Sequence, residues 1–288
     1  NIVHGARKDA EFARMCYNNP PHGVTHQKRD PSPLVGAQLN CVSDVVIDVM
    51  HNVHLGCWKQ MLQFLKSGPR ALCRLSMNQL VQMNRKLLRI RLPCEFSRQP
   101  RSIFDLDRWK ATELRSSLLY TGYIFLKGVV SSDIYQLYLK LSVSMNILHT
   151  ENSARRNRLL NFACALILEF IRDSHQLLGE GFVVYNVHTM SHVPDDVERF
   201  KSSVNAISAF PYENHLQAIK KMVKDPCNPL AQVCGRLDEN ARHDVYRHSK
   251  VTGTYISASA KDSMFYLSNT REFAMVQRQR RGDKRYDV

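Results

Sequence analysis

Hydrophobic residues recur at helical spacing along most of the chain from about residue 52 onward. Leu55, Trp58, Met61 and Leu65 lie three or four positions apart, and the helix-breaking sequence Ser67-Gly68-Pro69 follows them. The same spacing predicts further helices over residues 76–88, 106–127, 131–148, 155–178, 190–200 and 211–225, and another that begins near residue 229. The pattern therefore indicates an α-rich fold.

One short run departs from this helical pattern. Residues 41–48 bring β-branched side chains together and end on an acid, which predicts a buried strand with Asp48 at its C-terminal end. Shorter extended runs are expected at 182–185 and 254–256. Residues 1–40 are polar and rich in proline and glycine, so we expect loop there with one short helix near 10–17.

The charge of the chain favours a polyanionic partner. Forty lysines and arginines against 26 acids give a formal net charge of +14, in a chain whose 44% hydrophobic content is typical of a folded protein. Basic side chains neutralise phosphates and release counterions, so we expect nucleic acid, with solubility alone as the alternative. Arg278, Arg280 and Arg281 predict a flexible basic arm near the end of the chain.

Other classes of protein find less support. The longest apolar run, 159–171, is too short for a bilayer crossing, and the eight cysteines form no C-x-x-C pair, which indicates a reducing compartment. No signal peptide is evident and the chain begins at Asn1, so we expect an internal piece of a longer product. Neither a glycine-rich phosphate loop nor a G-x-S-x-G elbow occurs, and we expect no small-molecule substrate.

Two carboxylates are candidates for metal chemistry. Asp48 is expected at a strand end, where a rigid carboxylate beside an open edge suits divalent cations; its alternative role is to cap the following helix. Glu213 follows 165 residues later in the first turn of a helix, where its alternative role is to interact with the helix dipole. Histidine pairs such as His51/His54 and His188/His192 lack the companion ligands of a zinc motif, so we expect no structural zinc.

Long motifs are spread over about residues 7 to 240. They occupy residues 48–51 with 55–56, 92–102, 107–113, 118–122, 185–188, 195–200, 208–214 and 228–232. Together they closely resemble transposase-like proteins of animal genomes, a group similar to the CACTA (En/Spm) branch of the DDE transposases. The proline, aromatic and glutamate block that contains Pro211, Tyr212 and Glu213 is the motif shared with the plant members of that branch.

The resemblance implies an α-rich α/β fold with a ribonuclease-H-like core and three metal-binding carboxylates. Asp48 fits the second acid, at the end of the fourth strand, and Glu213 fits the third, on a helix after a large, mainly helical insertion. The first acid is expected upstream of this sequence. The core would then be incomplete, with one central strand and flanking helices, and the chain inactive alone.

The resemblance also divides the chain and assigns its partners. Residues 1–40 form a loop-rich segment of the core, 41–70 the strand and helix of the second acid, 71–200 the insertion, 201–245 the helix of the third acid and the helix after it, and 246–288 a basic, flexible tail. A complete protein would hold two Mg²⁺ (or Mn²⁺) ions for DNA strand cleavage and transfer, bind transposon ends as a homo-oligomer in the nucleus, and have no membrane contact.

Several residues are expected to contact DNA. They are Trp109, Lys110, Lys220 and Lys221, together with the three arginines of the tail. Trp109 would stack on a flipped base, or alternatively anchor the helical core. Two functional alternatives to a transposase stay open: a domesticated transposon-derived DNA-binding or chromatin scaffold without catalysis, and a metal-independent helical adaptor.

Overall fold

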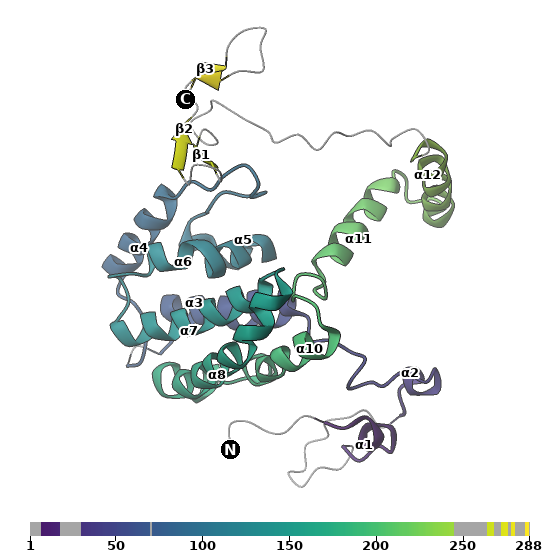
Figure 1. Ribbon diagram of the computed structural model, residues 1–288, viewed down its shortest axis with the longest axis horizontal. Helices are drawn as coiled ribbons and strands as arrows, with labels where there is room; N and C mark the ends of the chain where they lie inside the picture. Colours follow the sequence, from purple (N-terminus) through teal and green to yellow (C-terminus); the bar gives the residue numbers. More distant parts are fainter. Residues whose placement is uncertain are drawn as a thin grey trace. The chain divides into compact units, whose positions relative to one another are not determined.

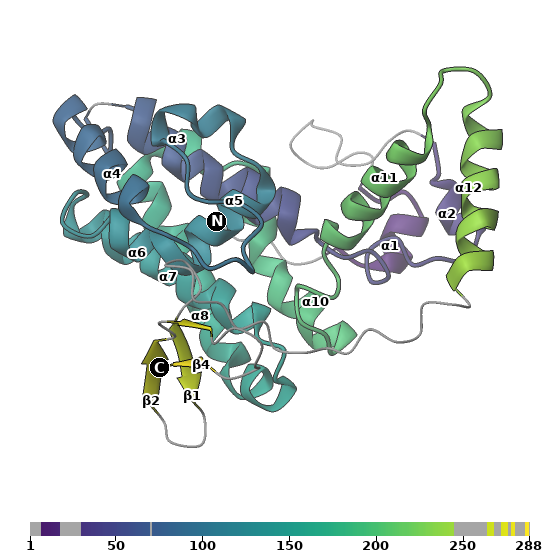
Figure 2. The ribbon, with the colours of Figure 1, turned by 90° about the horizontal axis from the view of Figure 1, so that it is seen from above.

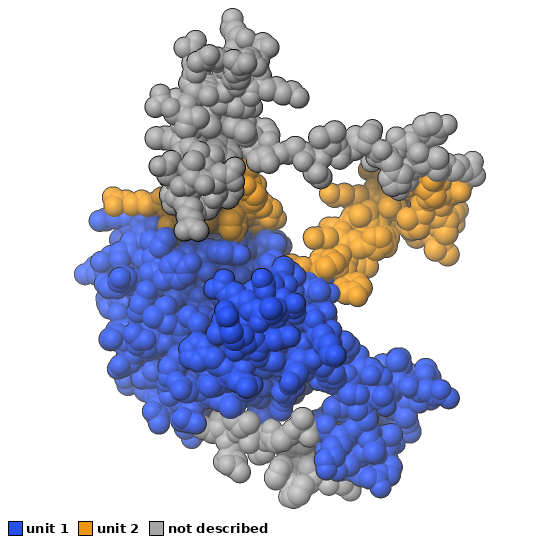
Figure 3. All heavy atoms as spheres, in the orientation of Figure 1, with its two compact units in different colours: residues 1–88, 101–209 blue, residues 89–100, 210–288 orange. Residues whose placement is uncertain are grey.

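The computed structural model describes residues 7–17, 30–69 and 71–244 and four short strands beyond residue 263 (Figure 1). The chain forms two compact units, of which unit 1 comprises Asn1–Leu88 and Arg101–Ala209 and unit 2 comprises Arg89–Pro100 and Phe210–Val288 (Figure 3). Each unit is described by itself. The protein is mainly helical, which confirms the α-rich part of the expected fold.

Unit 1 is built from helices of unequal length and type. Its elements are α1 (Asp9–Ala13), α2 (Pro33–Gly36), the π-helix η1 (Met50–Trp58), α3 (Lys59–Ser67), α4 (Met77–Arg89), the 3₁₀-helix η2 (Ile103–Arg108), α5 (Ala111–Ser116), the π-helix η3 (Ser117–Thr121), α6 (Gly122–Phe125), α7 (Ser132–His149), α8 (Ser153–Leu178), the 3₁₀-helix η4 (Glu180–Phe182), α9 (Tyr185–Thr189), the 3₁₀-helix η5 (Met190–His192) and α10 (Val193–Phe200).

The core of unit 1 forms around the α7–α8 hairpin, whose two helices lie side by side in Figures 1 and 2. Side-chain caps begin both helices: Ser131 accepts a hydrogen bond from the Ile134 amide, and Asn152 from the Arg155 amide. Trp58, at the end of η1, is fully buried and its ring lies 5.4 Å from that of Tyr138 on α7. This burial fixes η1, the helix that follows Asp48, against the hairpin.

The single helix expected over residues 106–127 is divided into four shorter pieces, η2, α5, η3 and α6. Side chains from α7 cause part of this division, because the hydroxyls of Tyr138 and Ser142 both donate to the Leu118 carbonyl, at 3.0 and 2.8 Å. Competing donors of this kind loosen the regular helical ladder. Gly122 permits the close approach, since a Cβ there would lie 2.5 Å from the Tyr138 hydroxyl.

The expected buried strand at residues 41–48 is wrong. The segment forms turns over 41–43, bends at 44–45 and is extended without a ladder partner over 46–48, and Val45 is half exposed. Its amides bond to side chains instead: those of Val42 and Ser43 both donate to Oδ1 of Asp9, at 2.8 and 3.1 Å. A strand needs a neighbouring strand for these groups, and within the described part of unit 1 none is present.

Smaller differences concern residues 182–185 and the tail. The extended run expected at 182–185 is not a strand: residue 182 ends η4, and residue 185 begins α9. The weak strand expected at 254–256 lies outside the described residues. The tail expected to be a flexible arm includes four short strands in its described part: β1 (Met264–Leu267) pairs antiparallel with β2 (Glu272–Met275), and β3 (Arg278–Gln279) with β4 (Tyr286–Asp287).

Unit 2 also contains two exposed helices, α11 (Phe210–Met222) and α12 (Pro229–Asp244), which contact each other. The turn between them depends on Gln232, whose side chain accepts from the Lys224 amide at 2.9 Å and donates to the Cys227 carbonyl at 2.6 Å. Most of the described residues of these two helices are exposed. Of the described helices, none is both long and apolar enough to cross a bilayer.

Two histidines lie in the core of unit 1. His54 on η1 is fully buried and its ring lies 5.5 Å from that of His149 on α7. Burial and, less strongly, Arg115 lower the pKa of His149 to about 4, against the opposing effects of its hydrogen bond with the Met145 carbonyl and of Glu151. Burial likewise holds the pKa of His54 well below its usual range, helped by His149 and Arg115. Both rings are therefore neutral at neutral pH.

We expect this pair to make unfolding pH-dependent. The unfolded chain takes up protons below the ordinary histidine pKa of about 6.5, and the folded rings do not, so stability is full above that value and falls as pH drops toward 4. Between pH 4 and 6.5, His149→Gln should reduce the slope of the unfolding free energy against pH by up to about 1.4 kcal/mol per pH unit. Urea titrations measure this, with His175→Gln, whose side chain is 39% exposed, as the control; equal slopes for His149→Gln and the parent would contradict it.

Candidate functional site

Asp48 is held by hydrogen bonds to both of its carboxylate oxygens. Oδ1 accepts from the amides of Met50 and Ala209, at 3.1 and 2.8 Å. Oδ2 accepts from the His51 amide at 3.2 Å and pairs with Nδ1 of the same histidine. The bonds to the first residues of η1 are those of a helix-capping aspartate. The bond to Ala209 goes further, because it ties the carboxylate to the residue just before α11.

These bonds determine the charge of Asp48. Partial burial by itself would raise its pKa, but the Ala209 amide, the His51 side chain and the amides of Met50 and His51 outweigh burial and lower the pKa below the usual aspartate value. The carboxylate is therefore ionised at neutral pH. With two partners on each oxygen, it has no acceptor position left for a cation unless a donor withdraws. His51 is the donor best able to withdraw, since 57% of its side chain is exposed.

An ion pair on α10 holds the segment that leads to Asp48. Arg199 donates to the carbonyls of Ser43 and Val42, at 2.8 and 3.4 Å, and also pairs with Asp196. Asp196 in turn accepts from the Ile47 amide at 2.8 Å and is only 3% exposed. Its burial raises its pKa, against the opposing effects of the Ile47 amide and Arg199. The Asp196–Arg199 pair thus provides part of the backbone bonding that a sheet would otherwise supply.

The π-helix after Asp48 packs against α9. The Asn52 side chain donates to the Thr189 hydroxyl at 2.6 Å. Gly56 allows the helices to approach closely, since a Cβ there would lie 2.7 Å from Nδ2 of Asn186. Long π-helices are rare and often accompany functional sites. Four segments that lie far apart in the sequence therefore come together around residues 47–56: 48–56, 185–189, 195–200 and 208–209.

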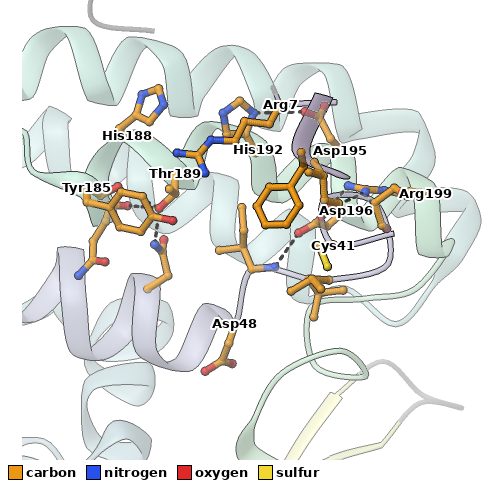
Figure 4. Close-up of a pocket in the computed structure, with 18 of the residues that line it drawn as sticks. Arg7, Cys41, Asp48, Tyr185, His188, Thr189, His192, Asp195, Asp196 and Arg199 are labelled. Atoms are coloured by element: carbon orange, nitrogen blue, oxygen red, sulfur yellow. Dashed lines mark hydrogen bonds and ion pairs between the residues drawn. The ribbon is translucent and has the colours of Figure 1, made fainter. Parts of the chain in front are cut away.

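A cavity of about 770 Å³ lies beside this arrangement (Figure 4). Its wall includes the segment 41–48, α9 and α10. Tyr185 is 75% exposed at the cavity, and the rings of His188 and His192 are in edge contact 5.6 Å apart. In Figure 4 the carboxylate of Asp48 points away from these histidines. Among the described residues, no group of three or more His, Cys, Asp or Glu side chains is arranged to hold a metal ion.

The other residues expected to be functional fall in several places. Glu213 lies in the first turn of α11, in unit 2, so the two acids are not joined in one described unit. Trp109 is 4% exposed and its Nε1 donates to the Ser102 carbonyl at 3.0 Å, which favours the core-anchor alternative. Lys110, Lys220 and Lys221 are exposed. Arg278 begins β3, and Arg280 and Arg281 lie outside the described residues.

Sequence reasoning missed the contributions of Ala209, Asp196 and Arg199. Asp196 and Arg199 fall within the motif 195–200, which was noted only for its resemblance. A signal was present, because an acid and a base three residues apart on a short amphipathic helix often pair. Nothing local indicated that the pair would bond to residues about 150 positions earlier. Ala209 contributes only its amide, so its side chain carries no signal.

Comparisons with known proteins add no family to this geometry. No protein-family model matches the chain, and neither a curated protein nor a solved structure does.

We expect Arg199→Met to destabilise unit 1 by roughly 3 kcal/mol, because it leaves the Asp196 carboxylate buried without its cation. The double change Asp196→Asn/Arg199→Met should cost less than the sum of the single changes. Urea unfolding measures both. Hydrogen exchange should show the Ile47 amide exchanging faster in Arg199→Met than in the parent, while the Ile134 amide at the start of α7 is unchanged. Additive energies, or an unaltered Ile47 amide, would contradict the described coupling.

Proposed function

We propose that this chain carries the later part of the catalytic region of a DDE-type cut-and-paste DNA transposase. In this proposal Asp48 and Glu213 are the second and third metal-binding acids, and a first acid is supplied by residues outside the printed sequence. The observation that supports it most is the meeting of four separated motifs around Asp48. Ala209 bonds to the carboxylate itself, Asp196 to the Ile47 amide just before it, and α9 packs on η1 just after it, so separated motifs together hold the backbone around this acid.

Chain connectivity supports a joint role for the two acids, whatever the relative placement of the two units. The Asp48 carboxylate lies 2.8 Å from the Ala209 amide, and Glu213 is the fourth residue after Ala209. Four residues span at most roughly 14 Å when fully extended, and about 6 Å along a helix. The chain itself therefore limits how far the Glu213 backbone can lie from Ala209.

The residues present fit hard divalent cations in donor type. Asp48 is ionised and Glu213 is an exposed carboxylate, and carboxylate oxygens are the ligands that Mg²⁺ and Mn²⁺ prefer. Bound there, such ions would activate water for strand cleavage and a 3′-hydroxyl for strand transfer. Asp48 would have to exchange one of its present donors, and withdrawal of His51 would free Oδ2. The exposure of that histidine makes the exchange feasible without unfolding η1.

The proposed core is ribonuclease-H-like. Residues 46–48 are extended but unpaired in the described structure, and they would become the end of the fourth strand only by pairing with strands from outside this sequence. Residues 71–200 would be the insertion, and in the described structure they are largely helical. DNA, a second copy of the protein and a nuclear location belong to the same proposal.

A DNA-binding or chromatin scaffold without catalysis is the second candidate. It is favoured by the complete engagement of Asp48 in structural hydrogen bonds, which leaves a working cap and no open ligand position. The two candidates differ in one respect: the scaffold needs Asp48 only for folding, and the transposase needs its charge for metal binding.

The deciding experiment is Mg²⁺-dependent nicking of transposon-end DNA by the full-length protein. Asp48→Asn and Glu213→Gln should each lower the rate by about 100-fold or more, because each removes a negative ligand of the cation. Chelation of the metal should abolish nicking. Asp44→Asn and Glu239→Gln, which alter exposed acids elsewhere in unit 1 and unit 2, should leave it unchanged. Nicking that survives both active-acid changes would exclude the transposase proposal.

A further inference from the structure

The positive charge of unit 1 is concentrated on one part of it. No acid occurs between Asp48 and Leu88, where this part of unit 1 ends, whereas basic residues there occupy positions 59, 66, 70, 74, 85 and 86. In contrast, residues 101–209 hold 12 basic and 11 acidic residues. The excess of positive charge within unit 1 therefore comes largely from α3, α4 and the segment that connects them.

Four described side chains of this region form what we call the α3–α4 basic surface: Lys66, Arg74, Arg85 and Lys86. Lys66 donates to the Phe104 carbonyl at 2.9 Å and Lys86 to the Lys127 carbonyl at 2.5 Å, so both bond to neutral backbone. Within the described residues, no ion pair to a carboxylate involves any of the four. Elsewhere in unit 1 the pairing is different, since Lys140, for example, pairs with Glu169 and Asp173. The surface thus keeps its full charge.

Nearby acids are directed to other groups. Asp107 lies beside the first half of α3, where its carboxylate accepts from Gln63 at 3.4 Å and its carbonyl from Lys59 at 3.1 Å. Asp105 acts on Arg101, whose pKa is raised chiefly by its hydrogen bond with Glu113. Within the described residues, neither acid forms an ion pair with Lys66, Arg74, Arg85 or Lys86.

A hollow of about 710 Å³ opens between the end of α3 and the beginning of α4. Lys66 and Arg74 line it together with Ser76, Met77 and Gln79, the first residues around the N-terminal end of α4. The helix dipole adds partial positive charge at that end. The hollow therefore combines two side-chain cations with a favourable helix terminus.

The spacing of the cations favours a long polyanion over a small one. Arg74 and Arg85 are both exposed; Arg74 precedes α4, and the helix from Met77 to Arg85 spans roughly 12 Å at a rise of about 1.5 Å per residue. A single phosphate cannot reach both. Duplex DNA carries about one negative charge per 1.7 Å of its axis, so its backbone contacts cations at both ends of such a helix.

We propose that the α3–α4 basic surface binds the phosphate backbone of duplex DNA. This inference deepens the proposed function and rests on it for the identity of the partner, but it requires neither metal nor catalysis. The surface is a DNA contact on unit 1 that differs from the contacts expected from the sequence, which were Trp109, Lys110, Lys220, Lys221 and the arginines of the tail. Contacts to phosphates position a protein on DNA without reading its sequence, so the surface would orient the duplex.

The test is the salt dependence of DNA binding by the whole chain, measured by fluorescence anisotropy with a labelled duplex and without divalent metal. Arg74→Gln and Arg85→Gln should each weaken binding and reduce the slope of log K against log salt by about 0.9, and the double variant by about 1.8. Both residues are exposed, so the fold should be retained, which circular dichroism checks. Arg172→Gln, an exposed arginine on α8, is the matched control and should leave the slope unchanged.

Two results of the salt titration would overturn the inference. One is an unchanged slope in the double variant; the other is a reduction of equal size in Arg172→Gln, which would indicate charge loss anywhere rather than at this surface. Binding to polyglutamate or to anionic vesicles that matches binding to DNA would also overturn the choice of partner. Asp48→Asn should retain the parental slope. Retained nicking in Asp48→Asn would count against the catalytic proposal alone, and an unchanged slope in the Arg74/Arg85 double variant would count against this inference alone.

Discussion

The hydrogen bonding of the Asp48 carboxylate is the interaction on which the rest of the candidate site depends. It joins the segment 41–48, the first turn of η1 and Ala209 at the end of unit 1. Four donors keep the group ionised in a partly buried position, where an unsolvated charge would otherwise be costly. The Asp196–Arg199 pair has a similar effect on the preceding backbone. Position and charge of this carboxylate are thus set by residues distributed over much of the chain.

Much of the helical structure followed from the sequence alone, for reasons that individual helices make clear. The spacing of Leu55, Trp58, Met61 and Leu65 predicted a helix up to Ser67, and α3 ends there. Ser131 caps α7 and Gly179 follows α8, close to the ranges 131–148 and 155–178 that the sequence predicted, because capping and glycine conformations are local properties. Glu213 lies in the first turn of α11, as its position after Pro211 indicated.

The expectations that were wrong concern interactions across the sequence. The β-branched run 41–48 has strand propensity, but strand formation needs a partner, and side chains of α1 and α10 take the backbone hydrogen bonds instead. The division of 106–127 depends on hydroxyls of α7, which no local pattern within that stretch reports. Asp48 itself was identified from its local context. The roles of Ala209, Asp196 and Arg199 were not, because their partners lie about 150 or more residues away.

The bond between Asp48 and Ala209 has a consequence for the order of folding. It closes a loop of 161 residues, and the Asn52–Thr189 bond closes one of 137. Closing loops of that length costs chain entropy that only the packing of the intervening helices offsets. The α7–α8 hairpin, whose contacts are local, should therefore form before Asp48 meets its partners. Until that packing has formed, the Asp48 carboxylate stays solvated in a nascent or partly folded chain.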